Sequence, residues 1–180
     1  MPARNRRDSA MRTFFNHAQD PVSCWTHAAG AAAALCGGLW LLLRGLWHHT
    51  PGLALGAGLC FCGSMVALYA ASAIYHYYPG NAASGGVKRL LRKMDHGMIY
   101  VLIAGSYTPF CVVLLPQPKG TVFCLALWGV ALAGALVKVL WINAPRVLST
   151  AVYLIMGWSV VFVAKDFAAL GQPCLTLVAL

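Results

Sequence analysis

The sequence predicts an all-α fold, a multi-pass bundle of transmembrane helices. Of its 180 residues, 60% are hydrophobic and only 9% are charged, whereas charged residues make up about a quarter of a typical soluble domain. The apolar residues fall in blocks of about 20, which is the length that a helix needs to cross ~30 Å of hydrocarbon. Together these observations exclude an ordinary soluble domain and predict an integral membrane protein whose natural partners are membrane lipids.

Five full helices are expected, each bounded by turn residues or charges. The first follows Asp20-Pro21, because aspartate often caps a helix and proline fits the first helical position. The expected helices are residues 22–43, 52–76, 94–115, 121–141 and 147–164. The apolar run 174–180 is too short to span and is expected to be the stub of a sixth helix. The chain thus divides into a basic cytoplasmic tail, residues 1–20, and a transmembrane helical domain, residues 21–180.

The basic residues predict the orientation of these helices. Ten of the 13 Lys and Arg residues lie in the tail, in the basic segment 77–93 or near the turn at 143–146. Short cytoplasmic loops carry an excess of Lys and Arg, so we expect an inner-membrane protein with a cytoplasmic N-terminus. The same distribution accounts for the net charge of +9. No nucleic-acid partner is expected, because no separate soluble domain presents these charges to a duplex.

The seven cysteines predict neither a disulfide framework nor a metal ribbon. Nearly all of them lie inside apolar runs, and none forms a C-x-x-C pair. Cys60 and Cys62 are two residues apart and therefore point to different faces of a helix. These cysteines are expected to behave as small buried hydrophobic residues.

Polar residues gather where the second helix ends and the third begins. Ser72 and His76 are four residues apart, so a helix places both on one face. Asp95 and His96 open the apolar run of the third helix, and His27 lies near the start of the first. With the predicted topology, all five share one depth near the cytoplasmic face. His96 points about 100° away from Asp95 on an ideal helix, so we expect it either to support a site residue without binding the ion itself or to have a structural role.

Each candidate site residue has two interpretations. His76 is either a zinc ligand in an apolar shell or an interfacial histidine bonded to water or headgroups. Ser72 either orients His76 or a bound water, or bonds to the carbonyl four residues before it. Asp95 would cost roughly 2.5–3.5 kcal/mol at a helix centre and less at the interface. It either serves a site or complements the helix dipole and pairs with Arg92 or Lys93.

Three segments resemble the hemolysin III family, the bacterial branch of the group that contains the progestin and adipoQ receptors. They are S-A-I-Y-H (72–76), M-D-H-G-M-I-Y-V-L-I-A-G-S-Y-T-P-F (94–110) and L-S-T-A-V-Y-L-I-M-G-W (148–158). The resemblance covers about residues 20–170 and implies a seven-helix bundle with a cytoplasmic-side zinc site. It implies that His76 is a zinc ligand, that Asp95 lies beside the zinc-bound water, and that Ser72 lies near it.

The resemblance also implies what the chain lacks. The family's other two zinc ligands come from an H-x-x-x-H motif on its last helix, and residues 1–180 do not contain that motif. We therefore expect a C-terminally truncated relative with a weak or incomplete Zn²⁺ site, which missing helices or another protomer would complete.

The function implied is a role in membrane homeostasis, haemolysis or permeability. One alternative is a zinc-dependent hydrolase of lipid-like amides or esters, in which Asp95 acts as general base or orients the water and Ser72 helps to hold the charge. Another alternative is a receptor or sensor.

Overall fold

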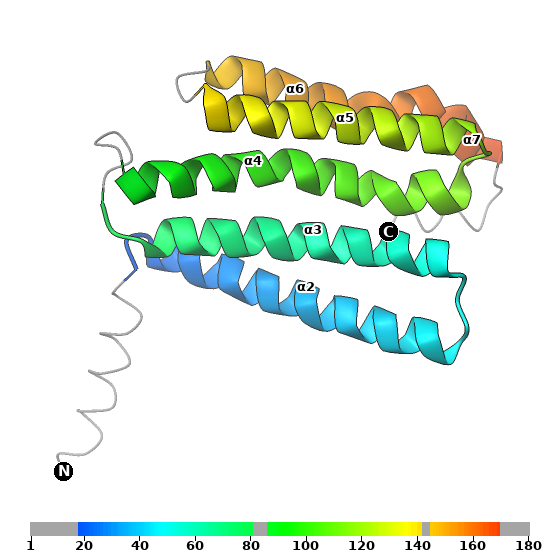
Figure 1. Cartoon of the computed structure of the whole chain (residues 1–180), viewed down its shortest axis with the longest axis horizontal. Helices are drawn as coiled ribbons and strands as arrows, with labels where there is room; N and C mark the ends of the chain where they lie inside the picture. The colour runs from blue at the N-terminus through cyan, green and yellow to red at the C-terminus, as the bar shows by residue number, and fades with distance from the viewer. Residues whose placement is uncertain (1–17, 81–85, 142–144, 170–180) are drawn as a thin grey trace, which may run out of the picture.

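The structure is a computed structural model that describes residues 18–80, 86–141 and 145–169. Within these ranges every regular element is helical (Figure 1). The α-helices are α2 (Pro21–Trp47), α3 (Gly52–Tyr77), α4 (Gly86–Pro109), α5 (Lys119–Leu140), α6 (Arg146–Trp158) and α7 (Ala164–Ala169). A π-helical turn (Phe110–Leu114) continues α4, and a 3₁₀ turn (Ser159–Val163) joins α6 to α7.

Five helical stretches of the described residues are long and apolar enough to cross a membrane. They are Pro21–Trp47, Gly52–Tyr77, Gly86–Leu114, Lys119–Leu140 and Val147–Asp166. Large apolar side chains such as Leu39, Leu125 and Ile155 are exposed on the outside of the bundle, where lipid tails would cover them. The predicted fold class, an all-α multi-pass membrane bundle, is confirmed.

The helices follow one another up and down through the bundle. Figure 1 shows α2, α3 and α4 side by side, with α5 and α6 packed beyond α4. Tyr100 and Ala104 of α4, Ala131 of α5 and Met156 of α6 form one buried core cluster. This cluster joins α4, α5 and α6.

Small residues let α3 and α4 approach closely. A Cβ atom added at Gly105 of α4 would lie 2.3 Å from Oγ and 2.6 Å from Cβ of Ser64 on α3. Ser64 is buried, and its hydroxyl donates to the Phe61 carbonyl at 2.7 Å. In membranes, where no hydrophobic effect drives helices together, close packing of this kind is a main source of association.

Three predicted helix boundaries were wrong. The first helix continues to Trp47 instead of ending at residue 43, and the last one continues through α7 to Ala169 instead of ending at residue 164. The helix expected to begin at residue 94 begins at Gly86. Residues 88–93, K-R-L-L-R-K, are therefore helical. Lys, Arg and Leu are good helix formers, and long basic side chains can reach the polar headgroups from a helix that enters the membrane.

The regular geometry of α4 is disturbed at Thr108-Pro109. Pro109 ends the α-helical part of α4, and the π-helical turn follows it at once. Proline lacks an N–H and interrupts the regular backbone ladder. The Thr108 hydroxyl donates to the Ala104 carbonyl at 2.9 Å and accepts from Trp128 Nε1 at 3.0 Å, which ties this part of α4 to α5.

The predictions for most of the basic tail and for the stub 174–180 lie outside the described residues. His48 and His49 follow the last turn of α2. They lie at the opposite end of α2 from Asp20, so they are far from the predicted polar layer.

Candidate functional site: a polar cluster between the start of α2 and the end of α3

The first two helices are joined by backbone hydrogen bonds at the end of the bundle where α2 begins. The Asp20 N–H donates to the His76 carbonyl at 3.1 Å, and the Gln19 N–H donates to the Tyr77 carbonyl at 3.4 Å. These bonds satisfy carbonyls that the last turn of a helix leaves without intrahelical partners. They bring the start of α2 against the end of α3 and set the depth of the polar residues on both.

Asp20 and His76 form the first side-chain pair. The carboxylate Oδ2 lies 3.0 Å from His76 Nδ1, and the side chains are 53% and 22% exposed, respectively. Asp20 occupies the predicted N-cap position, but its side chain makes no capping hydrogen bond. Since the carboxylate engages Nδ1, Nε2 is the His76 nitrogen that can bind a further group.

Ser72 and His27 form the second pair. Ser72 is buried, and its Oγ lies 2.8 Å from His27 Nδ1, so one hydrogen bond joins the two side chains. The ring of His27 lies 5.8 Å from the ring of His76, centroid to centroid. Asp20, His27, Ser72 and His76 are called the polar cluster below. Ser72 contacts His27 here, a partner that neither interpretation of Ser72 had named.

Asp95 and His96 lie on α4, and both are partly buried. The hydrogen bonds of the polar cluster join Asp20 to His76 and His27 to Ser72, and neither involves Asp95. Within the described ranges, the ion pairs do not include Asp95 with Arg92 or Lys93. The carbonyl of His96 accepts a hydrogen bond from the Tyr153 hydroxyl at 2.8 Å, which ties α4 to α6.

The described residues do not by themselves fit a zinc site. Among them, no group of three or more His, Cys, Asp or Glu side chains lies close enough to hold a metal ion. Structural zinc sites have four protein ligands and catalytic ones have three plus water. In the polar cluster, the Nε2 atom of His76 is available as a ligand, and the Asp20 carboxylate holds the other ring nitrogen, Nδ1. Metal-binding histidines commonly have such a partner.

Asp20 and Lys88 were missed as site-shaping residues. The D-P motif predicted Asp20 only as a cap, because its partner His76 is 56 positions away. Lys88 is only 5% exposed. Its ammonium donates to the carbonyls of Tyr75 and Tyr78, the latter at 2.6 Å, and lies 4.2 Å from the centroid of the Tyr75 ring. A cation at a helix C-terminus is favourable, so Lys88 holds the start of α4 against the end of α3.

Several known proteins are similar to the chain. Hemolysin-3 of Bacillus cereus is 32% identical over 142 residues, which cover 78% of this chain and 62% of that protein. The Hemolysin-3 homolog of Bacillus subtilis (strain 168) is 37% identical over 106 residues, which cover 59% of this chain and 48% of that protein. The human monocyte to macrophage differentiation factor is 27% identical over 150 residues, which cover 82% of this chain and 59% of that protein. The aligned part thus spans about half to six-tenths of the length of these relatives.

No solved structure gives a significant match to the chain. The family model described as "Haemolysin-III related" matches residues 15–179, which is nearly the whole sequence. The match with the monocyte to macrophage differentiation factor supports the relation to the progestin and adipoQ receptor group. With its apolar helices and its Hemolysin-3 relatives, the chain therefore belongs to the hemolysin III family.

Proposed function

We propose that the chain acts on the bilayer that it spans, by altering its permeability or by contributing to its homeostasis. The observation that carries this proposal is the match of 78% of the chain to a relative named Hemolysin-3. The five apolar spans are consistent with it, because their length and composition allow most of the described chain to lie within a bilayer. The cell membrane is the proposed location, with the N-terminus and the start of α4 on the cytoplasmic side.

Leakage from vesicles tests this proposal. The purified chain is reconstituted at several protein-to-lipid ratios into vesicles that contain self-quenching carboxyfluorescein. Dye release should increase with the amount of protein. It should also exceed the release from control vesicles, which contain an α-helical membrane protein of unrelated sequence. Erythrocyte lysis is measured in parallel. Release that never exceeds this control would contradict an effect on permeability.

For the polar cluster, we propose that His76 contributes one Zn²⁺ ligand through Nε2, with Asp20 holding Nδ1. The described residues supply too few ligands for a closed site, so the remaining ligands would come from other segments or from another protomer. Zinc would then bind weakly to the chain, and His76→Ala would remove that binding. His48→Ala, at the other end of α2, is the matched control and should leave it unchanged.

Zinc binding is measured as metal retained per chain after equilibrium dialysis against buffered free Zn²⁺. Comparable loss in His76→Ala and His48→Ala would indicate adventitious binding to histidine. Tight binding that His76→Ala leaves intact would show that the ligand assignment is wrong.

A second candidate function is a zinc-dependent hydrolase of lipid-like amides or esters. The pairing of His76 with Asp20 favours it, since a carboxylate commonly orients a metal-binding histidine. In this function Asp95 and Ser72 would lie near the reacting water, as the family resemblance implies. Zinc-dependent release of fatty acid from a defined amide or ester lipid would support the hydrolase. Dye leakage that is unaffected by chelation would favour the permeability function.

A further inference from the structure

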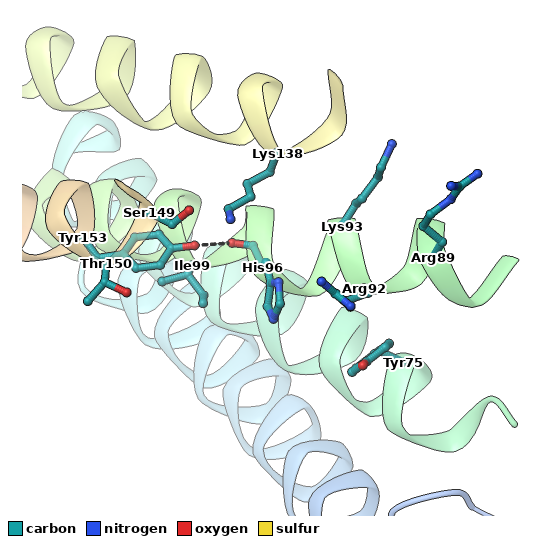
Figure 2. A pocket seen from close by; sticks show the side chains of 10 residues that line it. All are labelled: Tyr75, Arg89, Arg92, Lys93, His96, Ile99, Lys138, Ser149, Thr150 and Tyr153. Atoms are coloured by element: carbon teal, nitrogen blue, oxygen red, sulfur yellow. Dashed lines mark hydrogen bonds between the residues drawn. The ribbon is translucent and has the colours of Figure 1, made fainter. Parts of the chain in front are cut away.

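A second polar region lies on the other side of α3, between α4, α5 and α6. It is an open cavity of about 500 Å³, a size typical of small-molecule sites. Figure 2 shows that its lining comes from the end of α3, the first turns of α4, the end of α5 and the start of α6. Its lining residues are Tyr75, Arg89, Arg92, Lys93, His96, Ile99, Lys138, Ser149, Thr150 and Tyr153. None of them belongs to the polar cluster.

The charge of this cavity is strongly positive. Three of its cations, Arg89, Arg92 and Lys93, come from α4, and the fourth, Lys138, comes from α5. The described residues include only three carboxylate side chains, all aspartates. Asp20 pairs with His76, and Asp166 pairs with Lys119 near the opposite end of α4. Asp95 is the third, and it is not among the lining residues, so the four cations line the cavity without a carboxylate.

The neighbours of these cations make an anion a suitable ligand. Lys93 donates to the Val139 carbonyl, whereas no carboxylate in the described part of the chain forms an ion pair with Arg89, Arg92 or Lys138. In Figure 2, Lys138 extends toward Ser149, and Arg92 points toward His96. An arginine fork and an ammonium group are the side chains that most often bind phosphate oxygens.

Hydroxyl groups complete one wall of the cavity. Ser149 of α6 is only 6% exposed, although it lines the cavity, and Thr150 lies beside it. The Tyr153 hydroxyl donates its hydrogen to the His96 carbonyl at 2.8 Å, which fixes the ring in the wall. Hydroxyl donors beside guanidinium and ammonium groups suit a tetrahedral oxyanion, which accepts several hydrogen bonds at once.

The depth of the cavity places it at the headgroups. The span that contains α4 has 29 residues, which is about 43 Å of helix at 1.5 Å per residue. This exceeds the ~30 Å of hydrocarbon in a bilayer. The excess accommodates the first turns of α4, where the cations are, and Lys138 is two residues from the end of α5. Long basic side chains favour the headgroup region, so we expect the cavity to open where the lipid phosphates lie.

From this geometry we propose that the cationic cavity is a binding site for a phosphate group, borne by an anionic lipid headgroup or by a free phosphate. Arg92 and Lys138, on two different helices, hold the phosphate oxygens, with Ser149 as a hydroxyl donor. Arg89 adds attraction at the entrance. The site is separate from the polar cluster and does not depend on the permeability function.

The test uses the full chain, purified in neutral detergent at constant ionic strength. Three probes are titrated by calorimetry: dioctanoyl phosphatidic acid, dioctanoyl phosphatidylcholine and inorganic phosphate. We expect saturable binding of phosphatidic acid, at least tenfold tighter than that of phosphatidylcholine. Competition by inorganic phosphate at millimolar concentration would identify the phosphate group itself as the ligand. Binding of the lipid without such competition would identify the whole headgroup with its acyl chains.

Matched substitutions separate a site from diffuse charge attraction. Arg92→Gln and Lys138→Gln should each weaken phosphatidic acid binding at least fivefold. Arg44→Gln removes the same charge at the opposite end of the bundle, where Arg44 packs on Trp40, and should leave binding unchanged. Should either cavity variant elute as an aggregate, Arg89→Gln, an exposed residue at the cavity, replaces it with a smaller expected loss.

Two results would overturn the proposal. One is binding that does not saturate with any of the three probes. The other is an equal loss in Arg44→Gln and in the cavity variants, which would show attraction to the net charge of the chain and no discrete site.

Discussion

The close approach of α3 and α4 can be tested with one methyl group. Gly105→Ala would place a Cβ 2.3 Å from Ser64 Oγ and 2.6 Å from Ser64 Cβ. Rotation of the hydroxyl cannot relieve the contact with Cβ, so the helices must separate. Overpacking of this kind costs about 1–3 kcal/mol. A displaced Ser64 also loses its bond to the Phe61 carbonyl, worth about 0.5–1.5 kcal/mol, whereas alanine returns about 0.5–1 kcal/mol of helix propensity. We expect a net destabilisation of about 1–3 kcal/mol from these terms.

The assay is heat denaturation in detergent, followed by intrinsic tryptophan fluorescence at a fixed scan rate. For soluble domains of 150–250 residues, 1 kcal/mol corresponds to about 2–4 °C in Tm, so a decrease of several degrees is expected. Gly129→Ala is the matched control, because an added Cβ there meets nothing within 4 Å. Ser64→Gly in the Gly105→Ala background should restore part of the loss, because it removes the clashing atoms. Equal Tm values for Gly105→Ala and Gly129→Ala would refute the close approach.

Two further predictions concern the site and the topology. Asp95→Asn should leave expression and Tm almost unchanged, since asparagine keeps an acceptor oxygen, but it should abolish any zinc-dependent lipid hydrolysis; His96→Gln should cost stability more than activity. A folded but inactive His96→Gln protein, together with an unfolded Asp95→Asn protein, would reverse these assignments. In a cysteine-free background, a membrane-impermeant maleimide added outside should label Thr50→Cys and not Tyr78→Cys, because the end of α3 is predicted to be cytoplasmic. Equal labelling from outside would contradict the predicted orientation.

The spans were predictable because their signal is local. A run of about 20 apolar residues is recognisable without knowing what it packs against, and all five predicted spans are present. The error at the start of α4 is also local in origin. Charges often mark loops in membrane proteins, but the basic residues of 88–93 have high helix propensity, and Lys88 is held by carbonyls of α3.

The contacts within the polar cluster were only partly predictable. Helical spacing correctly placed Ser72 and His76 at one end of α3, and the topology brought His27 to the same depth. The pairings themselves join residues 45 and 56 positions apart. Which hydroxyl meets which ring depends on how α2 and α3 are rotated about their axes, and that rotation is set by packing along the whole interface. Asp20 illustrates the limit, since a local motif predicted its position and could not predict its partner.

The end of α3 separates the two polar regions and belongs to both. Consecutive residues of a helix point about 100° apart. His76 therefore faces α2 and the polar cluster, while its neighbour Tyr75 lines the cationic cavity. Their rings lie 5.0 Å apart, and Lys88 fixes the Tyr75 carbonyl from α4. No described side chain is shared between the two groups, so a metal at His76 and a phosphate in the cavity would use different donors. We therefore expect His76→Ala to lose zinc binding and to keep phosphatidic acid binding. Arg92→Gln should lose phosphatidic acid binding and keep zinc binding. These two results together would show two independent sites at one helix end.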